Sequence, residues 1–411
     1  MYRYAVFAVV LGVIAFAASG FAANAPRQIQ IETGGNACEN TPVEVTLDPA
    51  GMPDAPAVKN TATGTLYPAT LRDGKLVFIV DALAANAAVK AEVVPAERAN
   101  GAAPRVNVVK KDGEDVIDVQ IDGKPFTAYH HGVQWRKPFL WPVLSEGGVG
   151  VTRDFPMEVE STPKLARDHP HHKSLWSAYG EVNGHDLWAE GADAGNQRCK
   201  EVTFGSGDAY GWVRSVNKWE TKDGTPLLDE TREYRFYATP EKARFIDVFV
   251  TFKASQGDVL FSDTKEGGIV SVRMRPDICN AKAVITNALG DKGEDTAWGK
   301  PSPWCDFSGD VPGAGWRGIT IFDNPANLRY PSSWHVRNYG LMGANAFGYS
   351  YFNEKEYNHG LIPENGDYTI PSGTELAFRY RVYVHSGNVE EAATAARFQD
   401  YITPPKVSVA E

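Results

Sequence analysis

The sequence predicts an all-β protein, in which a small N-terminal β-sandwich is followed by a large antiparallel β super-sandwich with one C-terminal helix. Short segments that alternate apolar and polar residues recur along nearly the whole chain, and only residues 390–401 have a convincing helical pattern. No strand–helix–strand rhythm is present. With many strands and almost no helix, the simplest arrangement of the large part is two antiparallel sheets packed face to face.

The first 22 residues are typical of a secretory signal peptide. Arg3 supplies a positive charge, residues 5–18 are an uninterrupted apolar run, and small residues follow, so we expect cleavage after Ala22. A membrane anchor is the alternative, but a run of about 14 residues is shorter than the roughly 20 needed to span a bilayer. We therefore expect a periplasmic or secreted protein with no membrane span in the mature chain.

Residues 27–105 are expected to form the small β-sandwich. Strand-type runs such as residues 43–47 and 75–80 alternate with Pro, Gly and Asn breaks, and the Ala-rich segment 95–104 has the composition of a linker. Residues 28–105 contain no histidine and no tryptophan. We expect the small sandwich to contribute no catalytic side chain.

Residues 106–405 are expected to form the super-sandwich domain. Alternation is clearest at residues 376–384, where one face carries Leu, Phe, Tyr and Val side chains and the other carries Arg379 and Arg381. Further strands are predicted at residues 106–109, 115–121, 227–237, 245–252, 269–274 and 318–322. The predicted helix follows the last strand of this domain.

The overall charge limits the partners that the protein can have. The formal net charge is −10 and no block of Lys and Arg is present, which argues against nucleic acid and anionic membranes and leaves a small molecule or an oligosaccharide. The four cysteines are even in number, so disulfides are an option in an oxidising compartment. Their spacing does not resemble that of a zinc site.

Five of the nine histidines fall within 43 residues, at positions 130, 131, 169, 171 and 172. Each one could cap a turn or pair with a buried carbonyl. A divalent metal is a second interpretation, because neutral imidazole is a common metal ligand. In an extended segment, His169 and His171 share a face and His172 points away, so a third ligand has to come from His335 or a carboxylate.

Aromatic residues gather around turns after the second histidine group. Trp176 and Trp188 flank the turns at Gly180 and Gly184, with Asp186 beside them. Flat aromatic faces next to polar groups suit a sugar ring, which is apolar above and hydroxylated at its edge. Core packing is the alternative for each single tryptophan.

Two later segments carry charged candidates. If residues 261–276 form one strand, Lys265 and Arg273 share a polar face, and Glu266 falls on the apolar face. A β-bulge at the adjacent Gly267–Gly268 would turn Glu266 toward the polar face. A surface ion pair at a strand end is the alternative. Further along, His335 and Arg337 share a face and precede a glycine-rich loop.

Residues 130–157, 168–188, 262–274 and 334–348 together resemble a bacterial family labelled PmoA-like, after a methane monooxygenase subunit. The methane label does not fit, because a membrane monooxygenase subunit needs several apolar spans and the mature chain has none. The resemblance implies instead a protein that accompanies carbohydrate-degrading genes. It also implies a fold similar to the galactose-mutarotase type of super-sandwich, in which histidine and carboxylate side chains transfer protons to and from sugars.

These observations lead to the hypothesis of a periplasmic carbohydrate-active enzyme: a lyase, an epimerase or a hydrolase. A non-catalytic carbohydrate-binding or scaffold protein is the alternative. A two-carboxylate glycosidase is less expected, because only one carboxylate stands out. We expect the acid, the base and their carboxylate partner to converge on one cavity from these residues: His169, His171, His335 and Glu266. The residues expected to bind substrate or stabilise charge are Lys265, Arg273, Arg337, Trp176, Trp188 and Asp186.

Overall fold

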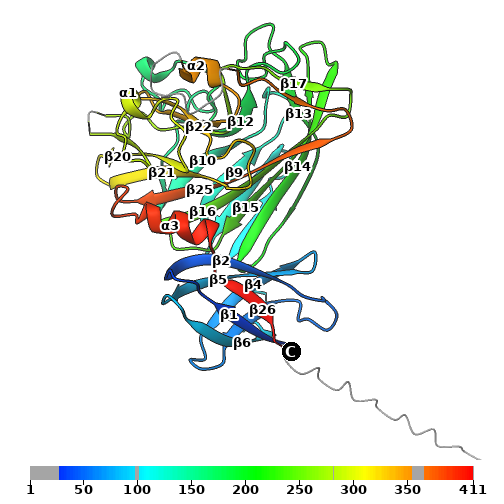
Figure 1. Cartoon of the computed structure of the whole chain (residues 1–411), viewed down its shortest axis with the longest axis vertical. Coiled ribbons are helices and arrows are strands. Elements are labelled where there is room, and N and C mark those ends of the chain that lie inside the picture. The colour runs from blue at the N-terminus through cyan, green and yellow to red at the C-terminus, as the bar shows by residue number, and fades with distance from the viewer. Residues whose placement is uncertain (1–26, 98–100, 281, 354–364, 411) are drawn as a thin grey trace, which may run out of the picture.

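The computed structural model describes residues 27–97, 101–280, 282–353 and 365–410, and the predicted signal peptide lies outside them. This part of the chain is built almost entirely of antiparallel strands, which confirms the predicted all-β fold class. Figure 1 shows two parts stacked along the long axis, with the small sandwich below the large one. None of the described helices is long and apolar enough to cross a membrane.

The small sandwich is a seven-stranded sheet in the order β2-β5-β4-β3-β6-β1-β26. It closes around a core that includes Ile31, Val58 and Phe78. Its last strand comes from the C-terminus, because β26 pairs antiparallel with β1 and places Val407 opposite Ile31. The chain thus returns to the first sheet just after residue 405. The strands are β1 (Gln28–Glu32), β2 (Cys38–Thr46), β3 (Pro56–Asn60), β4 (Leu66–Arg72), β5 (Lys75–Leu83), β6 (Ala88–Pro95) and β26 (Lys406–Val409).

The large sandwich consists of a nine-stranded and an eight-stranded sheet, with a separate pair of strands, β17 (Val259–Phe261) and β24 (Tyr368–Ile370). The nine-stranded sheet has the order β22-β23-β18-β12-β10-β9-β8-β7, and β11 is added to β10. Its strands are β7 (Val106–Lys110), β8 (Val116–Ile121), β9 (Lys124–His130), β10 (Phe139–Ser145), β11 (Val149–Gly150), β12 (Leu175–Tyr179), β18 (Gly267–Arg273), β22 (Ser333–Arg337) and β23 (Leu341–Asn345).

The eight-stranded sheet has the order β13-β14-β15-β16-β25-β21-β20-β19 and supplies the other half of the large core. Its strands are β13 (Asn196–Gly205), β14 (Tyr210–Glu220), β15 (Pro226–Tyr237), β16 (Ala243–Lys253), β19 (Val284–Asn287), β20 (Trp304–Val311), β21 (Gly315–Asp323) and β25 (Glu375–Ser386).

The two large sheets bury one face each in a shared core. On β22, Trp334 and Val336 belong to this core, so His335 between them points to the opposite face. On β25, Tyr380 belongs to the core and the next residue, Arg381, points away from it, as the alternation predicts. Each large sheet therefore has an outer face that carries polar side chains.

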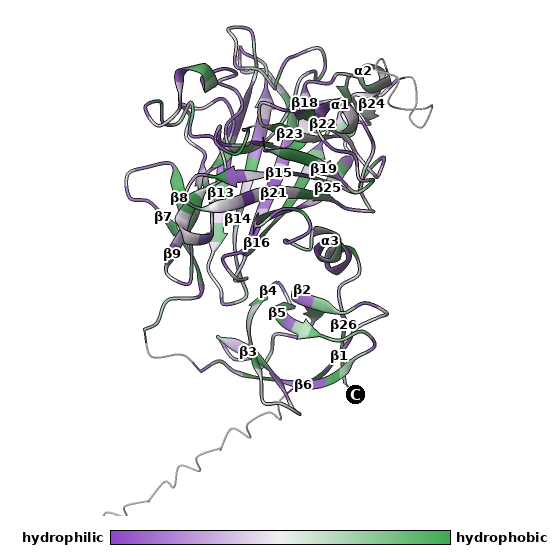
Figure 2. Cartoon of the chain, turned by 90° about the vertical axis from the view of Figure 1, so that its left-hand side faces the viewer, coloured by the Kyte–Doolittle hydropathy of each residue, from purple (hydrophilic) through white to green (hydrophobic). Residues whose placement is uncertain are grey.

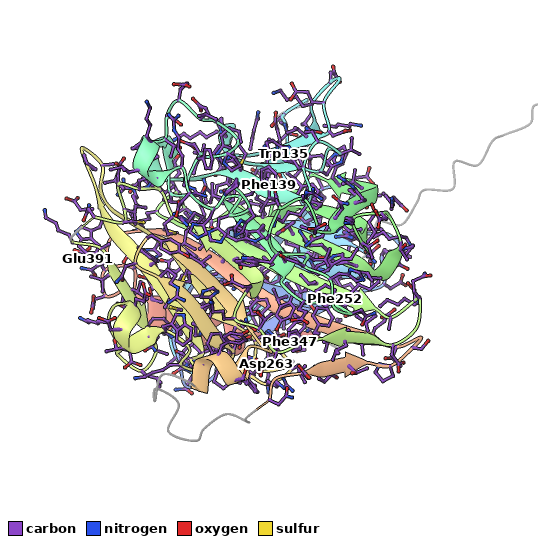
Figure 3. All side chains as sticks on the ribbon, turned by 90° about the horizontal axis from the view of Figure 1, so that it is seen from above. Trp135, Phe139, Phe252, Asp263, Phe347 and Glu391 are labelled. Carbon is purple, nitrogen blue, oxygen red and sulfur yellow. The ribbon has the colours of Figure 1, made fainter. Side chains whose placement is uncertain are left out.

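A second, smaller apolar cluster lies on the outer face of the nine-stranded sheet. It contains Phe139 and Trp188, with Trp135 packed against it. Figure 3 shows Trp135 and Phe139 well apart from Phe252 and Phe347, which belong to the main core. One member of this outer cluster, Trp188, also lines a cavity on that face.

The described helices are short. They are α1 (Glu294–Ala297), α2 (Tyr349–Asn353), α3 (Thr394–Ile402) and the 3-10 turns η1 (Glu146–Gly148) and η2 (Lys164–Ala166). The C-terminal helix α3 begins at residue 394 and not at the predicted residue 390, because Oδ1 of Asn388 accepts the N–H groups of Glu390 and Glu391 in a turn that precedes it. Figures 1 and 2 both place α3 between the large sheets and the small sandwich.

The strand predicted over residues 261–276 is interrupted. β17 ends at residue 261 and β18 begins at residue 267, and the residues between them form no strand. Where β12 pairs with β18, Trp176 faces Ser271 and Ala178 faces Gly268, so β18 carries one extra residue beside the glycine pair at which a bulge is expected. The lysine and the glutamate ahead of this pair therefore sit in a loop and not on a strand face.

The four cysteines, Cys38, Cys199, Cys279 and Cys305, are all free. The disulfides that their even number allowed are not formed.

Candidate functional site

A cavity of about 600 Å³ opens on the outer face of the nine-stranded sheet. All of its lining residues lie between positions 169 and 339, so the small sandwich contributes none of them. They are His169, His171, His172, Gly180, Glu181, Gly184, Asp186, Trp188, Ala189, Thr264, Lys265, Glu266, His335, Arg337 and Tyr339. Eight of the ten residues singled out in the sequence are therefore brought to one place, from segments far apart in the chain.

Two of the ten do not reach the cavity surface. Trp176 is fully buried and packs against the rings of His172 and Trp188, at centroid distances of 5.3 and 5.4 Å. It cannot serve as the expected stacking platform for a ligand, because no face of its ring is free. Arg273 is also buried, and it donates to Oδ1 of Asp168 at 2.7 Å and to Nδ1 of His172 at 3.0 Å. Both residues support the wall from behind.

The histidine segment is folded around one buried guanidinium. Arg153, which is completely buried, donates Nη1 to the carbonyls of Ala166 and Asp168 and Nη2 to the carbonyl of His169, each at 2.9 Å. His169 itself has a left-handed backbone with φ +43°. A cation that gathers several carbonyls of one loop can hold such a conformation in place, because each hydrogen bond is charge-assisted.

The extended geometry expected for the histidine segment is wrong. The N–H of His172 donates to the carbonyl of His169 at 3.0 Å, which closes a turn. As a result, the ring of His172 does not point away but stacks on His169 at 4.9 Å and meets His171 edge-on at 4.4 Å. The three imidazoles form one contiguous group.

An aspartate–histidine pair stands at the edge of this group. Oδ2 of Asp168 lies 2.5 Å from Nδ1 of His169. Burial acts to raise the pKa of Asp168, but Arg273, the hydrogen bond with His169, and Arg153 outweigh it, so this pKa lies below its usual value. Asp168 is therefore an anion at neutral pH and orients the half-exposed His169 ring. Its role was missed in the sequence, since its arginine partners are 15 and 105 residues away.

The other histidines of the cavity are kept uncharged. Burial lowers the pKa of His335 to about 3, and Arg337 and Lys265 act in the same direction. Burial also lowers the pKa of His171 to about 3, with Lys137 adding to the effect. Both imidazoles are therefore neutral between pH 5 and 8.

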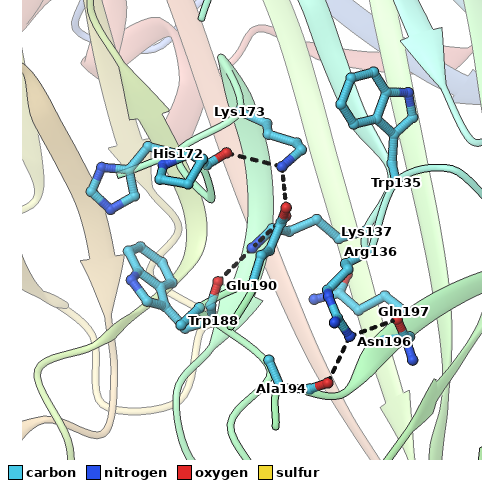
Figure 4. A network of polar contacts seen from close by, with 12 residues as sticks. Trp135, Arg136, Lys137, His172, Lys173, Trp188, Glu190, Ala194, Asn196 and Gln197 are labelled. Carbon is cyan, nitrogen blue, oxygen red and sulfur yellow. Dashed lines mark hydrogen bonds and ion pairs between the residues drawn. The ribbon is translucent and has the colours of Figure 1, made fainter. Parts of the chain in front are cut away.

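Two lysines and one glutamate support Trp188 from within the protein, as Figure 4 shows. Nζ of Lys137 donates to the carbonyl of Trp188 at 2.5 Å and lies 3.5 Å from Glu190, which also pairs with Lys173. Burial lowers the pKa of Lys137 to about 8, although Glu190 opposes this shift. Nothing in the local sequence indicated this network, because its members come from three separate segments.

The opposite rim carries charges that are already paired. Nη1 of Arg337 donates to Glu294 at 2.8 Å, and Nζ of Lys265 lies 3.4 Å from Glu266. Gly180 permits this arrangement, because a Cβ at that position would lie 2.5 Å from the carbonyl oxygen of Glu266. Glu266 is thus held at the cavity by a close backbone approach that only glycine allows.

Tyr339 adds an aromatic surface that the sequence analysis did not single out. Its ring stacks on His169 at 5.2 Å with an interplanar angle of 15°, and the guanidinium of Arg273 lies 4.3 Å from its centre. The Tyr339 side chain can contact a ligand because 39% of the residue's surface is exposed, whereas Trp176 is fully buried. The glycine-rich loop pattern around it was the available signal.

The histidine group does not make a metal site. No group of three or more His, Cys, Asp and Glu side chains suited to hold a metal ion is present among residues 27–97, 101–280, 282–353 and 365–410. The physical reason is that the imidazoles stack on one another and Asp168 is already bound by two arginines. The side chains therefore do not fit the metal interpretation of these histidines.

Two solved structures are distantly similar to this chain. A protein in glycosyl hydrolase family 38 from Enterococcus faecalis aligns with a TM-score of 0.44 and 9% identity, covering 94% of this chain and 47% of the other. This chain thus spans about half the length of that protein. Galactose 1-epimerase from Lactobacillus acidophilus NCFM aligns with a TM-score of 0.34 and 6% identity, covering 69% of this chain and 100% of the other.

No curated protein matches the sequence. A family model does match, and it covers residues 116–399, which is well over half of the 411 residues. The chain belongs to DUF6807, a family of unknown function.

Proposed function

We propose that this protein is a periplasmic or secreted carbohydrate-active enzyme that performs acid–base chemistry on a sugar or glycoside in the histidine cavity. The observation that carries the proposal is the Asp168–His169 pair, in which an ionised carboxylate orients an imidazole at the edge of a cavity. A base that is oriented by a third group is the arrangement used for general acid–base and nucleophilic catalysis.

The pair divides the two ring nitrogens of His169 between two tasks. Nδ1–H donates to Asp168, so Nε2 is the nitrogen that can take a proton from a substrate hydroxyl or C–H group. The negative charge of Asp168 then stabilises the imidazolium, which can return the proton in a later step. Arg153 and Arg273 keep Asp168 ionised throughout.

The neutral histidines have a different task from the one expected of them. With a pKa of about 3, His335 cannot be an imidazolium acid at neutral pH. A neutral imidazole can still donate a hydrogen bond to a carbonyl or hydroxyl oxygen and polarise it. Arg337 and Lys265 then stabilise negative charge that develops on that oxygen, and Glu266 is a second group able to transfer a proton.

A saccharide ring fits the shape and the chemistry of the cavity. A volume of about 600 Å³ lies within the range of small-molecule sites, and Tyr339 and Trp188 supply aromatic surface beside carboxylates and cations. Glu181 and Asp186 also line the cavity, so Glu266 is not the only carboxylate there. The proposed reaction is therefore that of a hydrolase, a lyase or an epimerase.

A carbohydrate-binding protein without catalysis is the second candidate. It is favoured by the ion pairs Arg337–Glu294 and Lys265–Glu266, which already neutralise much of the rim charge. In that case the cavity recognises hydroxyl groups and the histidines only complete its wall.

Product formation and binding of a panel of sugars and glycosides, followed by NMR, distinguish the two candidates. For the enzyme, we expect His169→Gln to abolish turnover and to change affinity by less than about threefold, because the lost group acts on the proton and not on the sugar ring. The matched control is His185→Gln, which replaces an exposed histidine next to the cavity but not among its lining residues. Binding without any turnover by the wild-type protein contradicts the enzyme and supports the binding protein.

A further inference from the structure

A second cavity, of about 780 Å³, lies where the small sandwich meets the outer face of the eight-stranded sheet. One wall is formed by β2 and β5, the other by β15, β16 and β25, and residues 404–408 close one side. We refer to it as the interdomain cleft. None of its lining residues belongs to the histidine cavity.

The wall on the large sheet carries two arginines and an aspartate in register across three strands. Arg235 on β15 faces Asp247 on β16, and Asp247 faces Arg381 on β25. Arg381 binds Asp247 through two hydrogen bonds, at 2.5 and 2.8 Å, and Arg235 donates to Glu233 at 2.7 Å. These guanidiniums are fixed in place by carboxylates and so present a rigid cationic surface.

Two further cations in the cleft have no partner among the described residues. Arg379 on β25 and Lys406 on β26 are exposed, and within the described residues neither side chain forms an ion pair or a hydrogen bond. They approach the cleft from different sides, since β25 belongs to the large sheet and β26 to the small sandwich. An anion placed between them would meet two charges that no side chain in the described part of the chain neutralises.

The charge of the cleft is opposite to that of the whole protein. Five cationic side chains line it, namely Lys75, Arg235, Arg379, Arg381 and Lys406, but only two carboxylates do, Glu44 and Asp247. The chain as a whole carries a net charge of −10. A positive concave surface on an acidic protein concentrates anionic ligands.

The remaining wall is apolar and built from small rings and branched side chains. Pro42 and Val77 come from the small sandwich, and Pro404 and Pro405 from the segment that follows α3. A ligand that matches both walls has charged groups on one edge and an apolar face on the other. The volume lies within the range of small-molecule sites.

We propose that the interdomain cleft binds an acidic saccharide, one that carries carboxylate or sulfate groups. Its charged groups lie between Arg379 and Lys406, and the apolar face of a sugar ring packs against the proline and valine wall. Arginine suits both anions, because its planar fork donates two parallel hydrogen bonds to carboxylate or sulfate oxygens. The site is separate from the acid–base chemistry of the histidine cavity, so either can exist without the other.

Calorimetric titration of the full-length mature protein tests this site with three probes: trigalacturonate, a sulfated chondroitin disaccharide and neutral maltotriose. We expect at least one acidic probe to bind, and to bind at least tenfold more weakly in 0.5 M NaCl, because salt screens charges that are open to solvent. Which acidic probe binds distinguishes carboxylate from sulfate. We expect maltotriose to bind at least tenfold more weakly than the preferred acidic probe.

Variants then locate the site. We expect Arg379→Gln to weaken binding of the acidic probe at least tenfold and Lys406→Gln to weaken it severalfold. Arg214→Gln is the matched control, because Arg214 is an exposed arginine on the same outer face, in one register row with Glu233, Phe249 and Arg379, but outside the cleft.

The proposal is overturned by any of three results. The first is that no acidic probe binds at millimolar concentration to protein that is folded by circular dichroism. The second is that Arg379→Gln and Arg214→Gln change affinity equally. The third is that Arg337→Gln, in the histidine cavity, removes the binding while Arg379→Gln does not.

Discussion

The histidine cavity and the interdomain cleft lie on opposite outer faces of the large sandwich and are built in different ways. Loops carry most of the histidine cavity, and its key groups are imidazoles, each of which has one nitrogen that donates and one that accepts a hydrogen bond when neutral. Regular strands carry the cleft, and its key groups are guanidiniums that stay charged at any physiological pH. If both proposals hold, proton transfer takes place on one face of the large sandwich and fixed charge is recognised on the other.

The largest effect is expected from removing the cation that shapes the histidine loop. Arg153→Ala leaves four backbone carbonyls and one bond of Asp168 without their donor, at a position where the guanidinium itself is completely buried. We expect a loss of about 4 kcal/mol in the free energy of unfolding, as for other buried charge networks that lose one partner. Urea denaturation measures it.

Arg214→Ala is the control for this substitution, since an exposed arginine should contribute less than about 0.5 kcal/mol. If Arg153→Ala costs less than about 1 kcal/mol, the loop is held by other contacts and the account of its geometry is wrong.

A smaller loss of stability is expected from the equivalent change in the cleft. Arg381→Gln removes both hydrogen bonds from Arg381 to Asp247, which then keeps the hydrogen bond from the hydroxyl of Tyr237 at 2.8 Å. We expect a loss of about 2–3 kcal/mol in the free energy of unfolding. Because the strands keep their register, turnover in the histidine cavity should be unchanged. A variant that loses turnover without losing stability would show that the two faces are coupled.

The two faces should also differ in their response to acid. The pKa of His335 is about 3 in the folded protein, below the value near 6.5 of an unperturbed histidine, so the unfolded chain binds this proton first as the pH falls. Its contribution to stability is therefore complete above pH 6.5 and is lost progressively between pH 6.5 and pH 3.

We expect His335→Gln to reduce the slope of unfolding free energy against pH by about 1.4 kcal/mol per pH unit between pH 6 and pH 4. Arg379→Gln, in the cleft, should leave that slope as it is in the wild type. Equal slopes for wild type and His335→Gln, measured by urea unfolding at several pH values, would show that His335 is not kept neutral.

The smallest effect is expected at the accessible ring of the histidine cavity. Tyr339→Ala removes a partly exposed aromatic surface, so stability should change by less than about 1 kcal/mol. Sugar affinity should fall about three- to tenfold, which corresponds to one stacking contact. Tyr339→Phe keeps the ring and should bind as the wild type does. A loss of affinity in Tyr339→Phe as large as in Tyr339→Ala would assign the contact to the hydroxyl.

From the sequence, we could predict most of the functional residues of the histidine cavity, but not how they are arranged. Residues such as His335 and Glu266 stood outside regular alternation, and that departure is what marked them. The pairing of Asp168 with Arg273 was not visible, because it depends on how a loop folds over a strand 105 residues away. Trp176 was misplaced for the same reason, since its neighbours decide whether its ring is covered.

For the interdomain cleft, the sequence predicted which side chains share a face of the strand but not what covers that face. Alternation at residues 376–384 placed Arg379 and Arg381 on one face correctly, because strand periodicity determines it. What covers that face was not predictable, since the small sandwich is distant in sequence and its C-terminal strand β26 arrives only after the large domain is complete. The local sequence pattern therefore predicts which side chains lie on each face of a strand, and tertiary packing decides which other segment covers that face.

The most direct test of the central claim is an NMR titration of the protein with ¹⁵N-labelled histidine. We expect His171 and His335 to keep the nitrogen shifts of neutral imidazole down to pH 5, because burial lowers the pKa of each to about 3. We also expect a downfield Nδ1 proton on His169 that disappears in Asp168→Asn. Titration of His171 and His335 near pH 6.5, or a His169 signal that Asp168→Asn leaves unchanged, would contradict the proposed acid–base site.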